Sequence, residues 1–125
     1  MTRAYDPENI FAKIIRGEIP NNTVVETDHT LAFRDIQPQA PVHVLVIPKG
    51  PYIDHADFTA NASDTELVDF ARVSAQICAS EGVMADGFRT ISNAGLHGVQ
   101  EVPHYHLHIL GGRPLGRMLG KVVAS

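Results

Sequence analysis

The stretch from residue 104 to residue 110 constrains the fold most, because histidine alternates there with apolar or aromatic residues. The residues are His104, Tyr105, His106, Leu107, His108, Ile109 and Leu110. A period of two is typical of a β-strand, whose successive side chains point to opposite faces of a sheet. The pattern therefore predicts a strand over 104–110 with three imidazoles on one face. Filling a core with three histidines is costly, since each buried ring nitrogen needs a hydrogen-bond partner. We interpret the histidine face as a reaction site.

The other periodic segments predict an α+β fold. Four further strands are expected at 23–27, 30–36, 42–47 and 87–92, and helices at 7–16 and 63–82. The long helix opens with Ser63 and Glu66, three residues apart as in a capping box, and stops at Gly82. We therefore expect one five-stranded, mainly antiparallel sheet with one long and one short helix.

Length and charge exclude several classes of protein. A chain of 125 residues without an internal linker predicts one domain spanning 1–125. The longest apolar run, Val44 to Ile47, is far shorter than the roughly 20 residues that a membrane-spanning helix needs. No apolar segment follows a basic start at the N-terminus, so we expect no secretory signal and a cytoplasmic protein. The net charge of −4 argues against binding to long nucleic acids.

The middle histidine of the alternating segment is the natural reacting group. Neighbouring histidines on one strand face are about 6.6 Å apart, so the outer two cannot both touch one small atom. Neutral imidazole is nucleophilic near pH 7, and a phosphorylated imidazole is labile. Attack by His106 on phosphorus would divide one displacement into two, with the flanking histidines moving protons. His43 is a further candidate, because it interrupts the β-branched and aliphatic run of 42–47.

Three segments of the chain resemble the histidine triad (HIT) family, in particular its Hint branch. They are QEVPHYHLHILGGRPLG at 100–116, NIFAKIIRGEIP at 9–20 and AFRDIQPQAPVH at 32–43. The resemblance covers nearly the whole chain and implies the HIT fold, with two five-stranded sheets joined across a homodimer. It also implies hydrolysis of the phosphorus–nitrogen bond of purine nucleoside 5′-phosphoramidates, with AMP or GMP as product and with no cofactor or metal.

The resemblance also assigns roles to individual residues. It implies that His106 is the nucleophile, that His43, His104 and His108 orient it and relay protons, and that Asp35 accepts the ribose hydroxyls. The base pocket would be walled by Phe11, Ile14, Phe33 and Ile36. The phosphate and its loop would be lined by Asn93, Val99, Gln100, Glu101 and Val102.

Two positions depart from the family pattern. Val99 stands where the branch commonly has glycine, and a β-branched residue tolerates positive φ poorly, so we expect a differently shaped loop. Glu101 stands where some members have serine. Since its charge would repel a phosphate, we expect its side chain to turn outward. Little in segment 117–125 can be matched to the family.

Three other functions stay open from the sequence. Hydrolysis of dinucleoside polyphosphates, as in the Fhit branch of the superfamily, would use the same triad, although the GGRP that follows it at 111–114 favours Hint. A zinc site could use His43, His104 and His106, but neither Cys nor Asp accompanies the triad. The chain could also bind nucleotides without a catalytic role.

Overall fold

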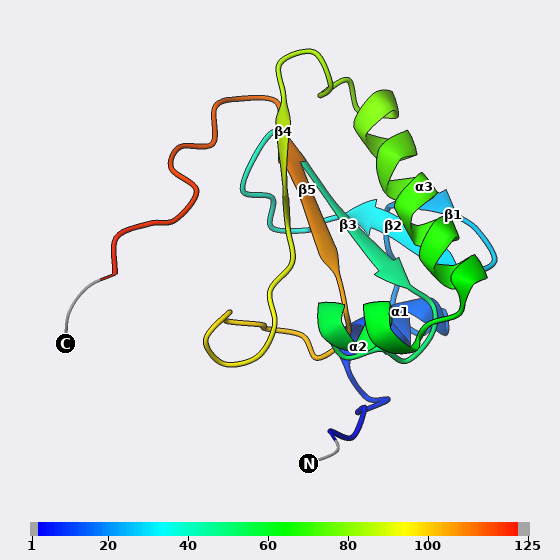
Figure 1. Ribbon diagram of the computed structural model, residues 1–125. Coiled ribbons are helices and arrows are strands. Elements are labelled where there is room, and N and C mark those ends of the chain that lie inside the picture. The colour runs from blue at the N-terminus through cyan, green and yellow to red at the C-terminus, as the bar shows by residue number, and fades with distance from the viewer. Residues whose placement is uncertain (1–2, 123–125) are drawn as a thin grey trace.

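The computed structural model describes residues 3–122 as one open five-stranded sheet with three helices (Figure 1). The strands are β1 (Thr23–Glu26), β2 (Thr30–Arg34), β3 (Val42–Pro48), β4 (Phe88–Ile91) and β5 (Leu107–Gly111). The helices are α1 (Ile10–Ile15), α2 (His55–Asn61) and α3 (Asp64–Ser80). The sheet order is β1-β2-β3-β5-β4, and every neighbouring pair is antiparallel. This architecture confirms the predicted α+β fold with its five-stranded antiparallel sheet.

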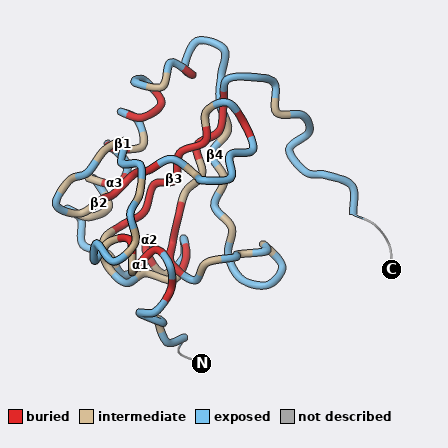
Figure 2. The backbone as a smooth tube through the Cα atoms, turned by 180° about the vertical axis from the view of Figure 1, so that it is seen from behind, coloured by how far each residue is buried: buried red, intermediate tan, exposed pale blue. Residues whose placement is uncertain are grey.

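The central strand β3 is buried on both faces of the sheet, because its side chains alternate between two apolar clusters. Val44 and Val46 belong to the cluster that α3 completes. Leu45 and Ile47 belong to a second cluster, to which α1 contributes Phe11. His43 points to the same face as Leu45, since the two residues are two positions apart on one strand. Figure 2 shows this buried centre, with exposed chain in the C-terminal segment. The strand therefore delivers His43 to the α1 side of the sheet.

Helix α3 begins and ends as its sequence predicts. The Ser63 side chain accepts a hydrogen bond from the Glu66 amide at 3.1 Å, and Glu66 accepts one from the Ser63 amide, which completes a capping box. Gly82 follows the last turn with φ +70°, a conformation that glycine adopts without strain. In the described part of the chain, no helix has the length and apolar character needed to cross a membrane.

The two short helices differ from the prediction. Helix α1 covers the six residues Ile10–Ile15 rather than 7–16. It begins after Asn9 and not near Pro7, because the Asn9 side chain caps it by accepting a hydrogen bond from the Ala12 amide. Helix α2 is absent from the prediction. Asp54 caps it, but Phe58 is its only buried side chain, so the segment carries no helical period. The expectation of only two helices is therefore wrong.

Strand β5 begins at Leu107 rather than at His104. The register pairs Val46 with Leu107, so that two residues further along Pro48 would have to pair with Tyr105. Proline has no N–H to donate, and the Tyr105 amide instead donates to the Tyr52 carbonyl at 2.8 Å. Residues 104–106 thus leave the ladder, yet their alternation persists. Tyr105 packs into the α3-side cluster, whereas the imidazole of His106 meets the ring of Phe11.

Candidate functional site

A pocket of about 130 Å³ opens where α1 and the loops after β2 and β4 meet the start of β5. Its lining residues are Phe11, Asp35, Gln39, Leu45, Asn93, Val99, Glu101, Val102, His106 and His108. Two of the three alternating histidines therefore reach one cavity, and their ring centroids are 5.1 Å apart.

Hydrogen bonding fixes the proton of His106. Its Nδ1 lies 2.7 Å from the backbone oxygen of His104, and a carbonyl oxygen can only accept, so Nδ1 carries the hydrogen. In the neutral ring the lone pair is therefore on Nε2. The edge of Phe11 packs against the imidazole, with ring centroids 5.0 Å apart. The ring is thus held with its nucleophilic nitrogen defined.

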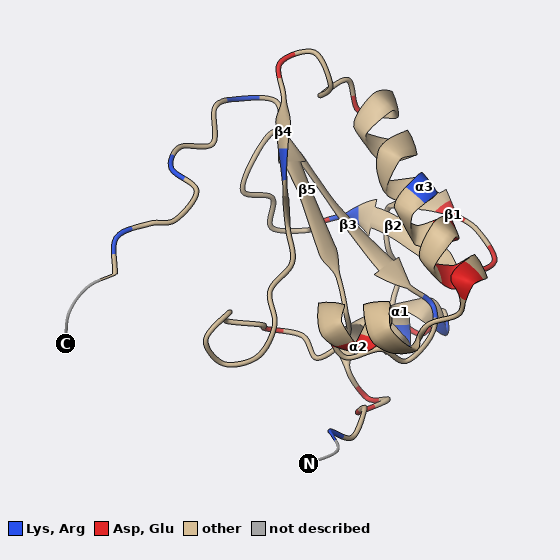
Figure 3. Cartoon of the chain, in the orientation of Figure 1, with Lys and Arg blue, Asp and Glu red and all other residues tan. Residues whose placement is uncertain are grey.

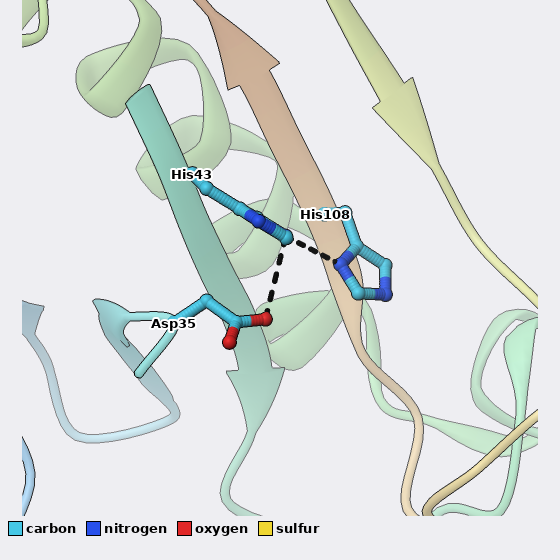
Figure 4. A group of neighbouring side chains, drawn as sticks. All are labelled: Asp35, His43 and His108. Atoms are coloured by element: carbon cyan, nitrogen blue, oxygen red, sulfur yellow. Dashed lines mark hydrogen bonds and ion pairs between the residues drawn. The ribbon is translucent and has the colours of Figure 1, made fainter. Parts of the chain in front are cut away.

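A second chain of hydrogen bonds fixes the proton of His108 (Figure 4). The amide of Gln39 donates to Nδ1 of His43 at 3.1 Å, so neutral His43 carries its hydrogen on Nε2. That Nε2 lies 2.9 Å from Nδ1 of His108 and 3.4 Å from a carboxylate oxygen of Asp35. Nδ1 of His108 accepts, so its own hydrogen is on Nε2. The pocket therefore holds an acceptor nitrogen on His106 and a donor nitrogen on His108.

Burial keeps these histidines neutral. The pKa of His104 and of His108 is lowered to about 4, chiefly by burial and in part by the neighbouring His106. Burial also lowers the pKa of His106, although its hydrogen bond to His104 and the charges of Asp35 and Glu101 raise it. At neutral pH the His106 ring is consequently uncharged, with a free lone pair on Nε2.

His104 supports the site from beneath and does not line the pocket. Its side chain is fully buried, and its Nε2 donates to the backbone oxygen of Pro48 at 2.8 Å. Its other ring nitrogen meets the hydroxyl of Tyr5, a contact that nothing in the sequence pattern indicated. His104 therefore acts through its backbone, which accepts the Nδ1–H of His106.

The loop after β4 contains one residue with a strained backbone and is held in place by one side-chain amide. Val99 has φ +56°, so the expectation that a β-branched residue avoids the left-handed region here is wrong. A Cβ on Gly98 would lie 2.5 Å from the backbone oxygen of Ala94, so this position has room only for glycine. Gln100 was expected to line the phosphate and its loop. Its side chain donates to the backbone oxygens of Ile53 and Val102 at 2.7 and 3.0 Å and so braces the loop, while its contact with a phosphate stays a prediction.

The pocket wall carries negative charge. Asp35 and Glu101 both line it, and none of its lining residues in the described chain is Lys or Arg. Glu101 is exposed to solvent and also borders the cavity, so the outward turn of its side chain stays a prediction. Basic residues appear instead along the C-terminal segment (Figure 3). The site therefore suits a ligand with few phosphate charges.

The predicted base-pocket residues divide into three groups. Phe11 lines the cavity as expected, whereas Ile14 and Phe33 are buried behind it in the α1-side cluster. Ile36 is 90% exposed and is not among the residues that line this pocket, so its contact with a base stays a prediction. Two lining residues were missed. Leu45 could have been found, because it is two residues from His43 on the same strand face, but no pattern marks Gln39.

One group of side chains could hold a metal ion, and it differs from the predicted set. Ligand atoms of Asp35, His43 and His108 all lie within 4.8 Å of one another. Two imidazoles and a carboxylate are suitable zinc ligands, so the residues fit such an ion. His104 is committed to Pro48 and Tyr5, and Nδ1 of His106 to a carbonyl, so the expected trio of His43, His104 and His106 is wrong.

Comparison with known proteins assigns the chain to a family. The model of the HIT domain matches residues 16–115 of the chain. The chain belongs to the HIT family. An uncharacterized 13.2 kDa HIT-like protein of Azospirillum brasilense is 50% identical over 121 residues, which cover 97% of this chain and 99% of that protein.

Two further relatives of this HIT protein carry more informative names. The purine nucleoside phosphoramidase of Escherichia coli K12 is 49% identical over 112 residues, which cover 90% of this chain and 93% of that protein. The crystal structure of a HIT family hydrolase from Legionella pneumophila has a TM-score of 0.80 and 42% identity, and the match covers 89% and 98% of the two chains. Family and fold agree with the resemblance seen in the sequence.

Proposed function

We propose that this HIT family hydrolase cleaves the phosphorus–nitrogen bond of purine nucleoside 5′-phosphoramidates through a nucleotidyl-His106 intermediate. The observation that carries the proposal is the orientation of His106, whose Nδ1–H is bound by a backbone carbonyl while its ring lines the pocket. The name of the Escherichia coli relative, a purine nucleoside phosphoramidase, supports the same substrate class. We propose that one domain spanning 1–125 carries this activity.

The reaction would proceed in two displacements. The lone pair of His106 Nε2 forms a bond to phosphorus, the phosphorus–nitrogen bond breaks, and the leaving nitrogen takes a proton from Nε2 of the imidazolium form of His108, which the negative charge of the bound phosphate favours. His108 is then neutral, the form whose Nδ1 accepts the hydrogen bond from His43. Water then attacks phosphorus, returns a proton to His108, and releases the nucleotide with the electron pair restored to His106.

Substrate binding would use the remaining pocket residues. Phe11 and Val102 offer apolar contacts to a purine, and the Asp35 carboxylate can accept hydrogen bonds from ribose hydroxyls. Asn93 and the backbone of the loop around Val99 and Glu101 would face the phosphate. Ile14 and Phe33 support the Phe11 wall from behind.

Intact-mass measurement after brief mixing with adenosine 5′-phosphoramidate tests the proposal. The wild type should gain the mass of one AMP moiety transiently and release AMP, whereas His106→Ala should do neither. His97→Ala is a suitable control, because His97 is exposed and does not line the pocket. Unchanged turnover in His106→Ala would overturn the proposed intermediate.

Hydrolysis of dinucleoside polyphosphates is the less favoured alternative. Such substrates bring several more negative charges than a phosphoramidate, and the pocket lining contains Asp35 and Glu101 without a lysine or arginine. We therefore expect a lower kcat/KM on diadenosine polyphosphates than on adenosine 5′-phosphoramidate. The opposite order of rates would favour the Fhit-like activity.

Zinc binding is a second candidate, favoured by the convergence of Asp35, His43 and His108. A zinc ion there would displace the hydrogen that joins the two imidazoles. Equilibrium dialysis should find one zinc ion in the wild type and none in His43→Ala if this function is correct. Stoichiometric zinc that persists in both proteins, or is absent from both, would contradict it.

We propose a homodimer formed through the β4 edge of the sheet. Among the described residues strand β4 pairs only with β5, and its Phe88 is 45% exposed, so the other edge of the strand could pair with a second copy. Light scattering should give twice the chain mass, and Thr90→Pro, which removes an edge amide, should shift it toward the monomer. A monomeric wild type would contradict the dimer.

The cytoplasmic location stays a prediction.

A further inference from the structure

The N-terminal segment touches the buried histidine that supports the nucleophile. This segment runs toward α1 at the end of the sheet where α2 also lies (Figure 1). The hydroxyl of Tyr5 is 2.6 Å from Nδ1 of His104, and the two rings meet edge to face with centroids 5.6 Å apart. Tyr5 is half-buried, whereas His104 is fully enclosed. The contact joins residues 99 positions apart in the sequence.

The direction of this hydrogen bond follows from the other nitrogen of the ring. Nε2 of His104 lies 2.8 Å from the carbonyl oxygen of Pro48, so Nε2 carries the hydrogen. Neutral imidazole then has its lone pair on Nδ1, and the Tyr5 hydroxyl must be the donor. Tyr5 and Pro48 together hold both nitrogens of His104 and exclude the other tautomer.

A second contact fastens the same segment. The guanidinium of Arg3 pairs with the carboxylate of Asp54, which is buried and caps α2. Asp54 keeps a low pKa, chiefly because of the Arg3 hydrogen bond. Residues 3–5 are therefore tied to α2 through Arg3 and to the site through Tyr5.

We propose that Tyr5 is a positioning residue of this enzyme, acting on the nucleophile His106 through His104. The Tyr5 hydroxyl fixes the imidazole of His104, whose own carbonyl receives the Nδ1–H of His106 at 2.7 Å. Without the hydroxyl, a buried acceptor is left unpaired and the residue that orients His106 loses one of its two ring anchors. The catalytic consequence rests on the proposed phosphoramidase activity, but the structural link does not.

Kinetics of Tyr5→Phe test the catalytic part. We expect kcat for adenosine 5′-phosphoramidate to fall about tenfold, the effect of leaving one buried acceptor unsatisfied, with KM changed less than about twofold. Tyr52→Phe is the matched control. Within residues 3–122 the Tyr52 hydroxyl bonds only to Glu66, and the ring packs on the α3-side cluster, so kcat of this variant should stay near the wild-type value. A raised KM with unchanged kcat would overturn the positioning role.

A double variant shows whether Tyr5 acts through His104. In the His104→Ala background the Tyr5 hydroxyl has no imidazole to hold, so adding Tyr5→Phe should lower kcat no further. An equal loss of kcat in both backgrounds would overturn the proposed route. It would mean that Tyr5 acts through general stability or through another contact.

Imidazole ¹⁵N NMR tests the link independently of turnover. In the wild type, His104 should be the Nε2–H tautomer with a hydrogen-bonded Nδ1. In Tyr5→Phe the Nδ1 signal should move toward that of an unbonded nitrogen, and the Nδ1–H signal of His106 should shift or broaden. Both signals should be unchanged in Tyr52→Phe. Unchanged signals in Tyr5→Phe would overturn the inference. If Tyr5→Phe shows these shifts but the wild type has no phosphoramidase activity, only the proposed function is overturned.

Discussion

Nε2 of His43 lies 2.9 Å from Nδ1 of His108, so an imidazole on β3 sets the proton position of an imidazole on the neighbouring strand β5. His43 does not line the pocket, but its Nε2 contacts two residues that do, His108 at 2.9 Å and Asp35 at 3.4 Å, and the hydrogen bond to His108 is the shorter contact. We therefore expect His43→Ala to lower kcat on the order of 100-fold with little change in KM. Steady-state kinetics check this, with the exposed His55 as control in His55→Ala. A loss that appears mainly in KM would contradict the relay.

The charge of Glu101 should be visible in the pH dependence of the reaction. It raises the pKa of His106 against the lowering effect of burial. Glu101→Gln should therefore lower that pKa further. If the neutral ring is the nucleophile, as proposed, the acid limb of kcat/KM should move to lower pH, and activity at pH 5 relative to pH 7 should rise. The control Glu18→Gln, remote from the pocket, should leave the acid limb in place. A shift of the limb to higher pH in Glu101→Gln would refute the proposed effect of Glu101 on His106.

Acid should destabilise the fold through His104. Its pKa is about 4 in the folded protein, against 6.5 for an ordinary histidine. Between these values the unfolded chain binds the additional proton. The free energy of unfolding therefore falls as pH drops below 6.5, and this group has no effect above it. We expect about 2 kcal/mol less stability at pH 5 than at pH 7 from this group. Urea unfolding at pH 5 and pH 7 measures this difference in the free energy of unfolding. His97→Gln serves as the control. An equal difference in His104→Gln and in the wild type would disprove the assignment.

The backbone strain at Val99 should be relievable. Asparagine tolerates the left-handed region far better than a β-branched residue, so Val99→Asn should raise the free energy of unfolding by about 1 kcal/mol. Val99→Gly should gain less, because glycine adds entropy to the unfolded chain. Chemical denaturation measures both. Val68, an exposed valine within α3, provides the comparison, since Val68→Asn relieves no strain. A loss of stability in Val99→Asn would show that the valine side chain contributes more than its strain costs.

The parts of the fold that could be predicted from sequence are those with local causes. The capping box of Ser63 and Glu66 set the start of α3, and the apolar run of 42–47 that His43 interrupts predicted strand β3. The family resemblance then identified Asp35, which lines the pocket with His106. Spacing alone could not have found Asp35, because it lies outside the regular strands.

The parts that could not be predicted depend on contacts between distant segments. The early end of the β5 ladder is caused by Pro48, more than fifty residues away, and only the strand register reveals it. Tyr5 meets His104 across a separation of 99 residues. The conformation of Val99 was misjudged because local preference disfavours positive φ, and the surrounding loop outweighs that preference.

Three consecutive residues, Tyr52 to Asp54, receive contacts from three separate parts of the chain. The Tyr105 amide donates to Tyr52, the Gln100 side chain donates to Ile53, and Arg3 pairs with Asp54. One local opening of this short stretch would release the N-terminal segment, the loop after β4 and the backbone beside the nucleophile together. We therefore expect amide exchange in these three parts to share one opening rate that differs from that of the sheet.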